Sequence, residues 1–114
     1  MKKVYRVKSD REFQRVFEEG TSFANRQFVV YTLKKEGQQH FRVGFSVSKK
    51  LGNAVRRNHI KRYMRESIYD LSNHIHPAYD LIVIARRDAV NQPLPTLKQN
   101  MYHVLRLAQV LKEN

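Results

Sequence analysis

Apolar residues recur at the three- and four-residue spacing of an amphipathic helix in three parts of the chain. The first helix is expected over residues 10–19, where Ser9 and Glu12 have the spacing of a capping box. The second begins at Asn53, a favourable N-cap residue, and runs to about Leu71. The third follows two prolines, and its apolar stripe consists of Leu97, Met101, Leu105, Ala108 and Leu111.

Three other stretches have the composition of β-strands. Residues 23–33 alternate only in part but contain FVVYTL, which is rich in β-branched and aromatic side chains. Residues 41–47 alternate cleanly, and the polar residues 34–40 predict a hairpin connection between these two strands. Residues 80–85 form an apolar run that is typical of a strand buried on both faces.

The order of these elements predicts one α+β domain over residues 1–114, a sandwich with the order helix–strand–strand–helix–strand–helix. A chain of 114 residues is long enough for a modest core. Gly44, inside the second strand, predicts a bulge or a close backbone approach. The strand–helix–strand unit over residues 41–86 would normally have a right-handed crossover.

The charge of the chain narrows the classes of function. Its 22 Lys and Arg against 10 Asp and Glu give a formal net charge of +12, which is tolerated when a polyanion neutralises it. Without cysteine there is no disulfide framework and no thiolate metal site. The N-terminal residues lack the apolar core of a signal peptide, and no run reaches transmembrane length. The expected class is a cytoplasmic nucleic-acid-binding protein, whose basic surface should also bind anions.

The positive charge is concentrated in residues 46–66, which contain no acidic residue before Glu66. The cations are Lys49, Lys50, Arg56, Arg57, Lys61, Arg62 and Arg65. At roughly 100° per residue, Ile60, Met64, Ile68 and Leu71 fall on one side of the helix, and Asn58, Lys61, Arg62 and Arg65 on the other. A solvated helix would mix both charge signs, so this face predicts contact with phosphates. Asn58 adds a group that can bond a ribose hydroxyl or a base edge.

The basic stretch contains the pattern Lys50-x-Gly52-x-Ala54-Val55-x-Arg57-Asn58-x-x-Lys61-Arg62-x-x-Arg65. Further motifs are Phe13-x-x-x-Phe17, Ala24-Asn25-Arg26-Gln27-Phe28, Arg42-Val43-Gly44 and Asp80-x-x-x-x-Ala85-Arg86. In this order the set resembles the bacterial ribonuclease P protein component over most of the chain. The resemblance implies a subunit of the ribonucleoprotein endonuclease that removes the 5′ leader of precursor tRNA. It also implies a left-handed crossover in place of the usual right-handed one.

The resemblance implies two RNA contacts. The catalytic RNA subunit would contact Lys49, Lys50, Ala54, Arg57, Asn58, Lys61, Arg62 and Arg65. The single-stranded leader of precursor tRNA would enter a cleft lined by Phe13, Phe17, Val29 and Tyr31. From the residues alone, phenylalanines four apart on a helix are more often core. The family's further aromatic residue near the C-terminus has no counterpart at Val110 or Leu111, so no leader contact is expected from the last helix.

No catalytic group is recognisable in the sequence. The carboxylates include no evident acid/base pair, and His74 and His76 lack a third metal ligand nearby. The resemblance assigns catalysis to the RNA subunit and its magnesium ions, so the protein is expected to be non-catalytic and to bind no cofactor or metal. A structural RNA-binding protein, such as a ribosomal component, is the alternative. It would share the basic surface but would not need the aromatic cleft.

Overall fold

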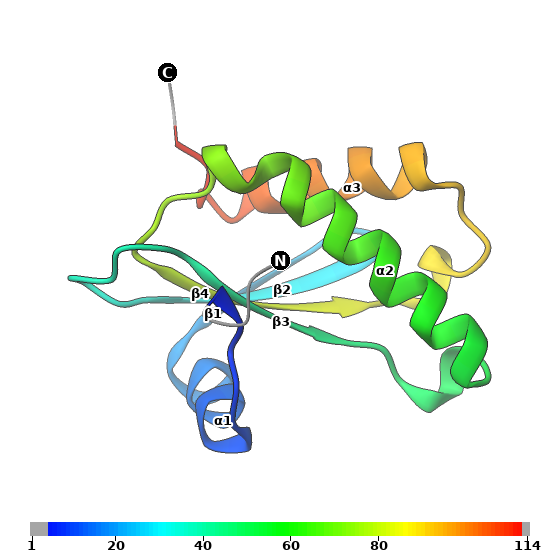
Figure 1. Cartoon of the computed structure of the whole chain (residues 1–114), viewed down its shortest axis with the longest axis horizontal. Coiled ribbons are helices and arrows are strands. Elements are labelled where there is room, and N and C mark those ends of the chain that lie inside the picture. The colour runs from blue at the N-terminus through cyan, green and yellow to red at the C-terminus, as the bar shows by residue number, and fades with distance from the viewer. Residues whose placement is uncertain (1–4, 113–114) are drawn as a thin grey trace.

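The structure is a computed structural model that describes residues 5–112. Its main elements are α1 (Asp10–Glu19), β1 (Thr21–Ala24), β2 (Phe28–Lys34), β3 (Arg42–Ser46), α2 (Ala54–Leu71), β4 (Tyr79–Ala85) and α3 (Leu94–Leu107). The strands form one sheet in the order β1-β2-β4-β3. Figure 1 shows α2 and α3 over one face of this sheet and α1 on the other. The fold is the predicted single α+β domain, with one strand more than expected.

The predicted strand–helix–strand unit is formed by β3, α2 and β4. The two strands are parallel neighbours, with Arg42 opposite Asp80 and Ser46 opposite Ile84. In Figure 1, β3 lies nearer the viewer than β4, both strands run toward the right, and α2 returns above them. The crossover is therefore left-handed, as the resemblance implies and against the general preference.

The predicted hairpin between residues 23–33 and 41–47 is wrong. β2 pairs antiparallel with β4, and β4 separates β2 from β3. Residues 34–40 thus connect two strands that do not pair. β4 takes the central position because its run is apolar toward both faces of the sheet. Only a strand with neighbours on both sides and layers above and below can bury such a run.

Residues 23–33 form two strands because a turn interrupts them. The Asn25 Oδ1 atom accepts hydrogen bonds from the backbone amides of Gln27 and Phe28, at 3.0 and 2.9 Å. This side chain therefore closes a tight turn after β1, and β2 begins at Phe28 and pairs antiparallel with β1. The turn explains why the alternation of polar and apolar residues is only partial in this region.

The three helices form where the sequence predicts them, apart from the end of the last one. Ser9 Oγ and Asn53 Oδ1 each accept a hydrogen bond from the amide three residues later, at 3.1 and 2.9 Å, so both predicted N-caps are present. α3 stops before Gln109, which has a φ of 59°. Leu111 instead forms an isolated bridge with Ile75. Within residues 5–112, no helix has the length and apolarity that a membrane span requires.

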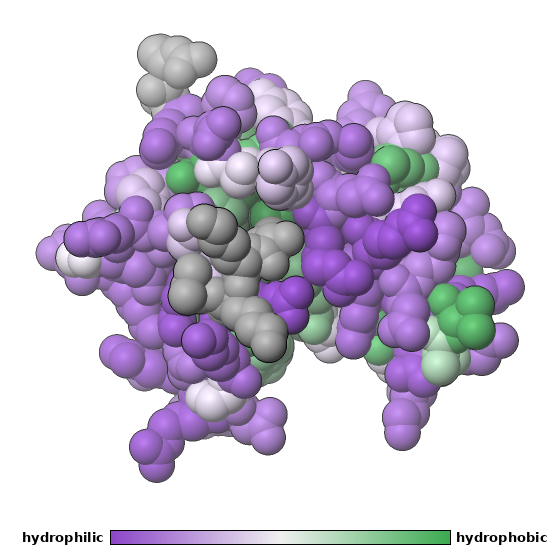
Figure 2. All heavy atoms as spheres, viewed as in Figure 1, coloured by the Kyte–Doolittle hydropathy of each residue, from purple (hydrophilic) through white to green (hydrophobic). Residues whose placement is uncertain are grey.

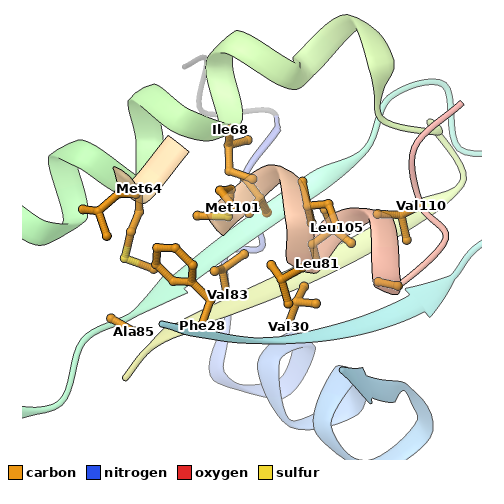
Figure 3. Close-up of a cluster of buried hydrophobic side chains, with 14 of the residues drawn as sticks. Phe28, Val30, Met64, Ile68, Leu81, Val83, Ala85, Met101, Leu105 and Val110 are labelled. Atoms are coloured by element: carbon orange, nitrogen blue, oxygen red, sulfur yellow. The ribbon is translucent and has the colours of Figure 1, made fainter. Parts of the chain in front are cut away.

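The main core lies between the sheet and the two helices above it (Figure 3). It includes Phe28 and Val30 of β2, Leu81 and Val83 of β4, Met64 and Ile68 of α2, and Met101 and Leu105 of α3. The predicted apolar stripe of α2 faces this core, with Ile60 buried and Leu71 half-buried. This packing fixes the rotation of α2 about its axis and directs its cationic stripe away from the core.

Candidate nucleic-acid interface

The start of α2 is shaped by a glycine. Gly52 has a φ of +147°, and a Cβ atom there would lie 2.5 Å from Cδ of Arg56. Only glycine fits this close approach without displacing the arginine. A short 3₁₀ helix, Lys49–Leu51, precedes the turn, and Ser48 Oγ accepts a hydrogen bond from the Lys50 amide at 3.2 Å. The lysines of this segment are thereby held next to the N-terminus of α2.

The eight residues that the resemblance implies for the RNA subunit form what we call the cationic surface. They are Lys49, Lys50, Ala54, Arg57, Asn58, Lys61, Arg62 and Arg65. Six lie on one stripe of α2 and two in the preceding 3₁₀ helix. Arg57, Lys61 and Arg65 are half-buried at the base of the stripe, and the other five are exposed. Figure 2 shows hydrophilic side chains gathered along α2.

Within residues 5–112, little neutralises this charge. Arg62 Nε lies 3.6 Å from Glu66 Oε1, and both side chains are largely exposed, which makes this a weak ion pair. Among residues 5–112, no other acidic side chain pairs with the cationic surface. Arg57 Nε is buried and has no hydrogen-bond partner in the same part of the chain. An anion bound here would accept charge-assisted hydrogen bonds from this guanidinium.

The opposite face of the sheet carries the predicted leader residues. β2 alternates, so that Phe28, Val30 and Thr32 point into the main core, whereas Val29 and Tyr31 point toward α1. The Phe17 ring of α1 meets the Tyr31 ring edge to face, with centroids 4.9 Å apart, and the Phe13 and Phe17 centroids are 6.4 Å apart. The structure thus brings the four predicted residues to one face.

These side chains are only partly covered. Phe17 is 36% exposed, and Phe13, Val29 and Tyr31 are half-buried. The fully buried side chain of α1 is Val16, which anchors the helix. The reading of both phenylalanines as plain core, which the spacing favoured, is therefore wrong for Phe17. Phe13 packs against Gly44, where a Cβ atom would come within 2.4 Å of its ring, so the predicted close approach at Gly44 is present.

Ile84 belongs to the same face, although no feature of the sequence predicted this. It pairs with Val29 in the register of β2 and β4. It is half-buried, whereas its neighbours on β4 from Asp80 to Val83 are all buried. α1 therefore covers one part of this sheet face and leaves the part around Val29 and Ile84 open. We call Phe13, Phe17, Val29, Tyr31 and Ile84 the aromatic surface.

A buried ion-pair network attaches α1 to the sheet. Arg42 Nε and Nη2 donate to the two carboxylate oxygens of Asp80, at 3.0 and 2.7 Å, and Lys35 Nζ lies 2.8 Å from Asp80 Oδ2. Arg42 Nη2 also donates to Glu12 of α1. Burial acts to raise the pKa of Asp80, but the hydrogen bonds from Arg42 and Lys35 outweigh it, so this pKa lies below its ordinary value. The network fixes the position from which α1 presents its aromatic rings.

A second link uses residues of the Ala24–Phe28 motif and the arginine after β4. Arg86 Nη1 donates to the backbone oxygen of Asn25 at 2.7 Å, and the Arg86 amide donates to the Gln27 oxygen at 2.8 Å. Asn25 Nδ2 donates to the backbone oxygen of Asn100 in α3, at 2.8 Å. These motif residues therefore tie the β1–β2 turn to β4 and α3, which is a structural role.

Comparison with known proteins agrees with this arrangement. A model of the ribonuclease P family matches residues 1–109. The ribonuclease P protein component of Listeria welshimeri is 56% identical over 113 residues, covering 99% of this chain and 95% of that protein. That of Latilactobacillus sakei is 54% identical, with coverages of 99% and 94%.

Solved structures give the same result. The Staphylococcus aureus RNase P protein superposes with a TM-score of 0.88 at 49% identity, covering 95% of this chain and 98% of that one. The Thermotoga maritima RNase P protein has a TM-score of 0.82 at 30% identity, with coverages of 90% and 96%. The chain belongs to the ribonuclease P protein family.

Proposed function

We propose that this chain is the protein subunit of ribonuclease P and acts with a catalytic RNA to remove the 5′ leader of precursor tRNA. The observation that carries the proposal is the presence of two separate surfaces on opposite faces of one sheet. The cationic surface lies on α2, and the aromatic surface lies beside α1. A single structural RNA footprint would need the first surface only. Family membership supports the same conclusion.

The cationic surface contacts the RNA subunit in this proposal. Arginine offers a planar fork to two phosphate oxygens and lysine a mobile point charge, so their mixture suits the irregular backbone of a folded RNA. Asn58 lies among the cations and can both donate and accept a hydrogen bond, which fits a ribose hydroxyl or a base edge. Arg57 is half-buried and its Nε atom is buried, so its guanidinium group lies at the base of this contact.

The aromatic surface holds the single-stranded leader. Unpaired bases expose their ring faces, and stacking on an aromatic side chain contributes about 1–3 kcal/mol per base without requiring a particular base. Leaders differ from one tRNA to the next, so this tolerance suits the substrate. Phe17 and Tyr31 supply the rings, and Val29 and Ile84 supply a flat apolar floor beside them.

The protein contributes binding, and the RNA subunit with its magnesium ions performs the hydrolysis. One observation supports this division: the buried carboxylate Asp80 is engaged by Arg42 and Lys35, an arrangement suited to structure rather than to proton transfer. Inorganic anions should occupy the cationic surface when no RNA is present, because the same donors would face solvent.

Reconstitution tests the proposal. The purified protein is added to a bacterial ribonuclease P RNA at a magnesium concentration too low for the RNA alone, and cleavage of precursor tRNA is followed. We expect cleavage at the mature 5′ end only when both components are present. Unchanged cleavage on addition of the protein, with the RNA shown to be folded, would contradict the proposed function.

A further inference from the structure

A hollow of about 250 Å³ lies beside the cationic surface and is lined by residues of α2, of the connection from β4 to α3, and of α3 itself. Its floor is apolar and consists of the buried side chains of Ile60, Ala89 and Leu97. Its rim consists of Pro93 and of five residues with polar groups, Arg56, His59, Tyr63, Asn91 and Gln92. None of these residues belongs to the two surfaces described above.

The rim side chains have unused hydrogen-bonding capacity. Within residues 5–112, the side chains of Arg56, His59, Asn91 and Gln92 make no hydrogen bond or ion pair, and Arg56 uses only its backbone amide in the cap at Asn53. The two amides and the imidazole can each donate and accept, whereas the guanidinium only donates. The His59 ring already lies against the Tyr63 ring, with centroids 4.3 Å apart, which forms an aromatic wall on the α2 side.

We propose that this hollow receives one unpaired nucleobase of the catalytic RNA. An apolar floor, an aromatic wall and a rim of mixed donors and acceptors match the face and edge of a base. A phosphate could use the cation and the amide N–H groups, but it would use neither the apolar floor nor the amide oxygens. The hollow is smaller than the roughly 300 Å³ at which sites for drug-sized molecules begin, which fits a single planar group. The inference rests on the proposed function, because the cationic surface brings the RNA to this place.

The position on α2 makes the two contacts compatible. His59 follows Asn58 directly, and Tyr63 follows Arg62, so the hollow and the cationic surface occupy adjacent stripes of one helix. An RNA strand whose phosphates lie on the cationic stripe would have an adjacent base within reach of the hollow. Asn91 has a φ of 65°, a conformation that asparagine tolerates better than most residues, and it places an amide at the rim.

The test measures affinity for a bacterial ribonuclease P RNA as a function of salt at a fixed pH of about 8. The variants are His59→Ala and Asn91→Gly, the second of which suits the backbone conformation. Tyr102→Ala is the matched control, because Tyr102 is an exposed aromatic residue of α3 that lies outside both the hollow and the cationic surface. Arg62→Ala reports loss of a cation. Thermal midpoints confirm that all four variants fold.

We expect His59→Ala to weaken binding about tenfold, which lies within the range for one stacked base, with an unchanged log–log salt slope. Arg62→Ala should lower the slope, and Tyr102→Ala should change neither quantity. Chemical probing should show an unpaired base protected by the parent protein and exposed with Asn91→Gly. Affinities of both hollow variants within twofold of the parent, or unchanged protections, would overturn the inference while leaving the proposed function intact. A parent protein that does not bind the RNA would overturn both.

Discussion

Replacement of Asp80 by asparagine should remove a large share of the protein's stability. The Asp80 side chain is completely buried and accepts two hydrogen bonds from Arg42 and one from Lys35. Asparagine keeps the shape but removes the charge, which leaves two cations facing one amide oxygen. Loss of one partner of a buried ion pair costs about 3–5 kcal/mol. Arg42 and Lys35 are 20% and 23% exposed, and Arg42 retains Glu12, so we expect the lower end, about 3 kcal/mol.

Urea unfolding of the full chain measures this change, and Asp70→Asn is the matched control. Asp70 Oδ2 lies 2.5 Å from Lys98 Nζ, but these side chains are 51% and 37% exposed. A surface ion pair of this kind contributes about 0–1 kcal/mol. Equal small losses in the two variants would refute the reasoning, because the buried network would then hold α1 no more firmly than a surface pair does.

The same network gives an acid-dependent stability. The folded-state pKa of Asp80 lies below its ordinary value of about 3.9, because the hydrogen bonds from Arg42 and Lys35 outweigh the effect of burial. A lowered carboxyl pKa stabilises the folded state fully above the unfolded pKa, and this stabilisation is lost as the pH falls through the folded pKa. The difference in unfolding free energy between the parent and Asp80→Asn should therefore narrow below about pH 4. A constant difference down to pH 2 would contradict the assignment.

The cationic surface and its charge give two further predictions. Arg57→Ala and Arg62→Ala should each weaken binding to the RNA subunit and lower the slope of log affinity against log salt concentration by roughly one or less. Filter binding at several salt concentrations measures both the affinity and the slope. Unchanged affinities and slopes would mean that the helix is merely solvated. Pyrophosphate at millimolar concentration should raise the thermal midpoint of the free protein, because it binds only the folded surface; a midpoint that stays constant at fixed ionic strength would count against this.

The parts of the fold that depend on local signals could be predicted from the sequence. The caps at Ser9 and Asn53 and the stripe of α2 are decided within a few residues. Spacing alone therefore identified the helices and the polar stripe of Asn58, Lys61, Arg62 and Arg65. Strand pairing is not local. Nothing within residues 34–40 indicates that β4, which begins only at Tyr79, lies between β2 and β3.

The aromatic surface shows a different limit of sequence analysis. Periodicity says that Phe13, Val16 and Phe17 share one side of α1, but it does not say which of them the sheet covers. That is decided by the position of the helix, which leaves Val16 buried and Phe17 at the margin. Ile84 was missed for the same reason, because every residue of an apolar run looks buried until the covering layer is known. The resemblance to a family, rather than the pattern, identified Phe17 and Tyr31 as candidates for binding.

The most direct test of the central claim compares precursor and mature tRNA. Holoenzyme assembled from the catalytic RNA and Phe17→Ala or Tyr31→Ala should bind precursor tRNA more weakly, by about 1–3 kcal/mol per stacked base lost. Its affinity for mature tRNA, which lacks the leader, should equal that of the parent, and the defect should vanish when the leader is cut to a nucleotide or two. Each variant should fold, since Phe17 is 36% exposed and Tyr31 is half-buried. The loss of folding stability should be smaller than that for a fully buried phenylalanine, which is about 3–5 kcal/mol. Equal losses for precursor and mature tRNA would contradict the assignment of the aromatic surface to the leader.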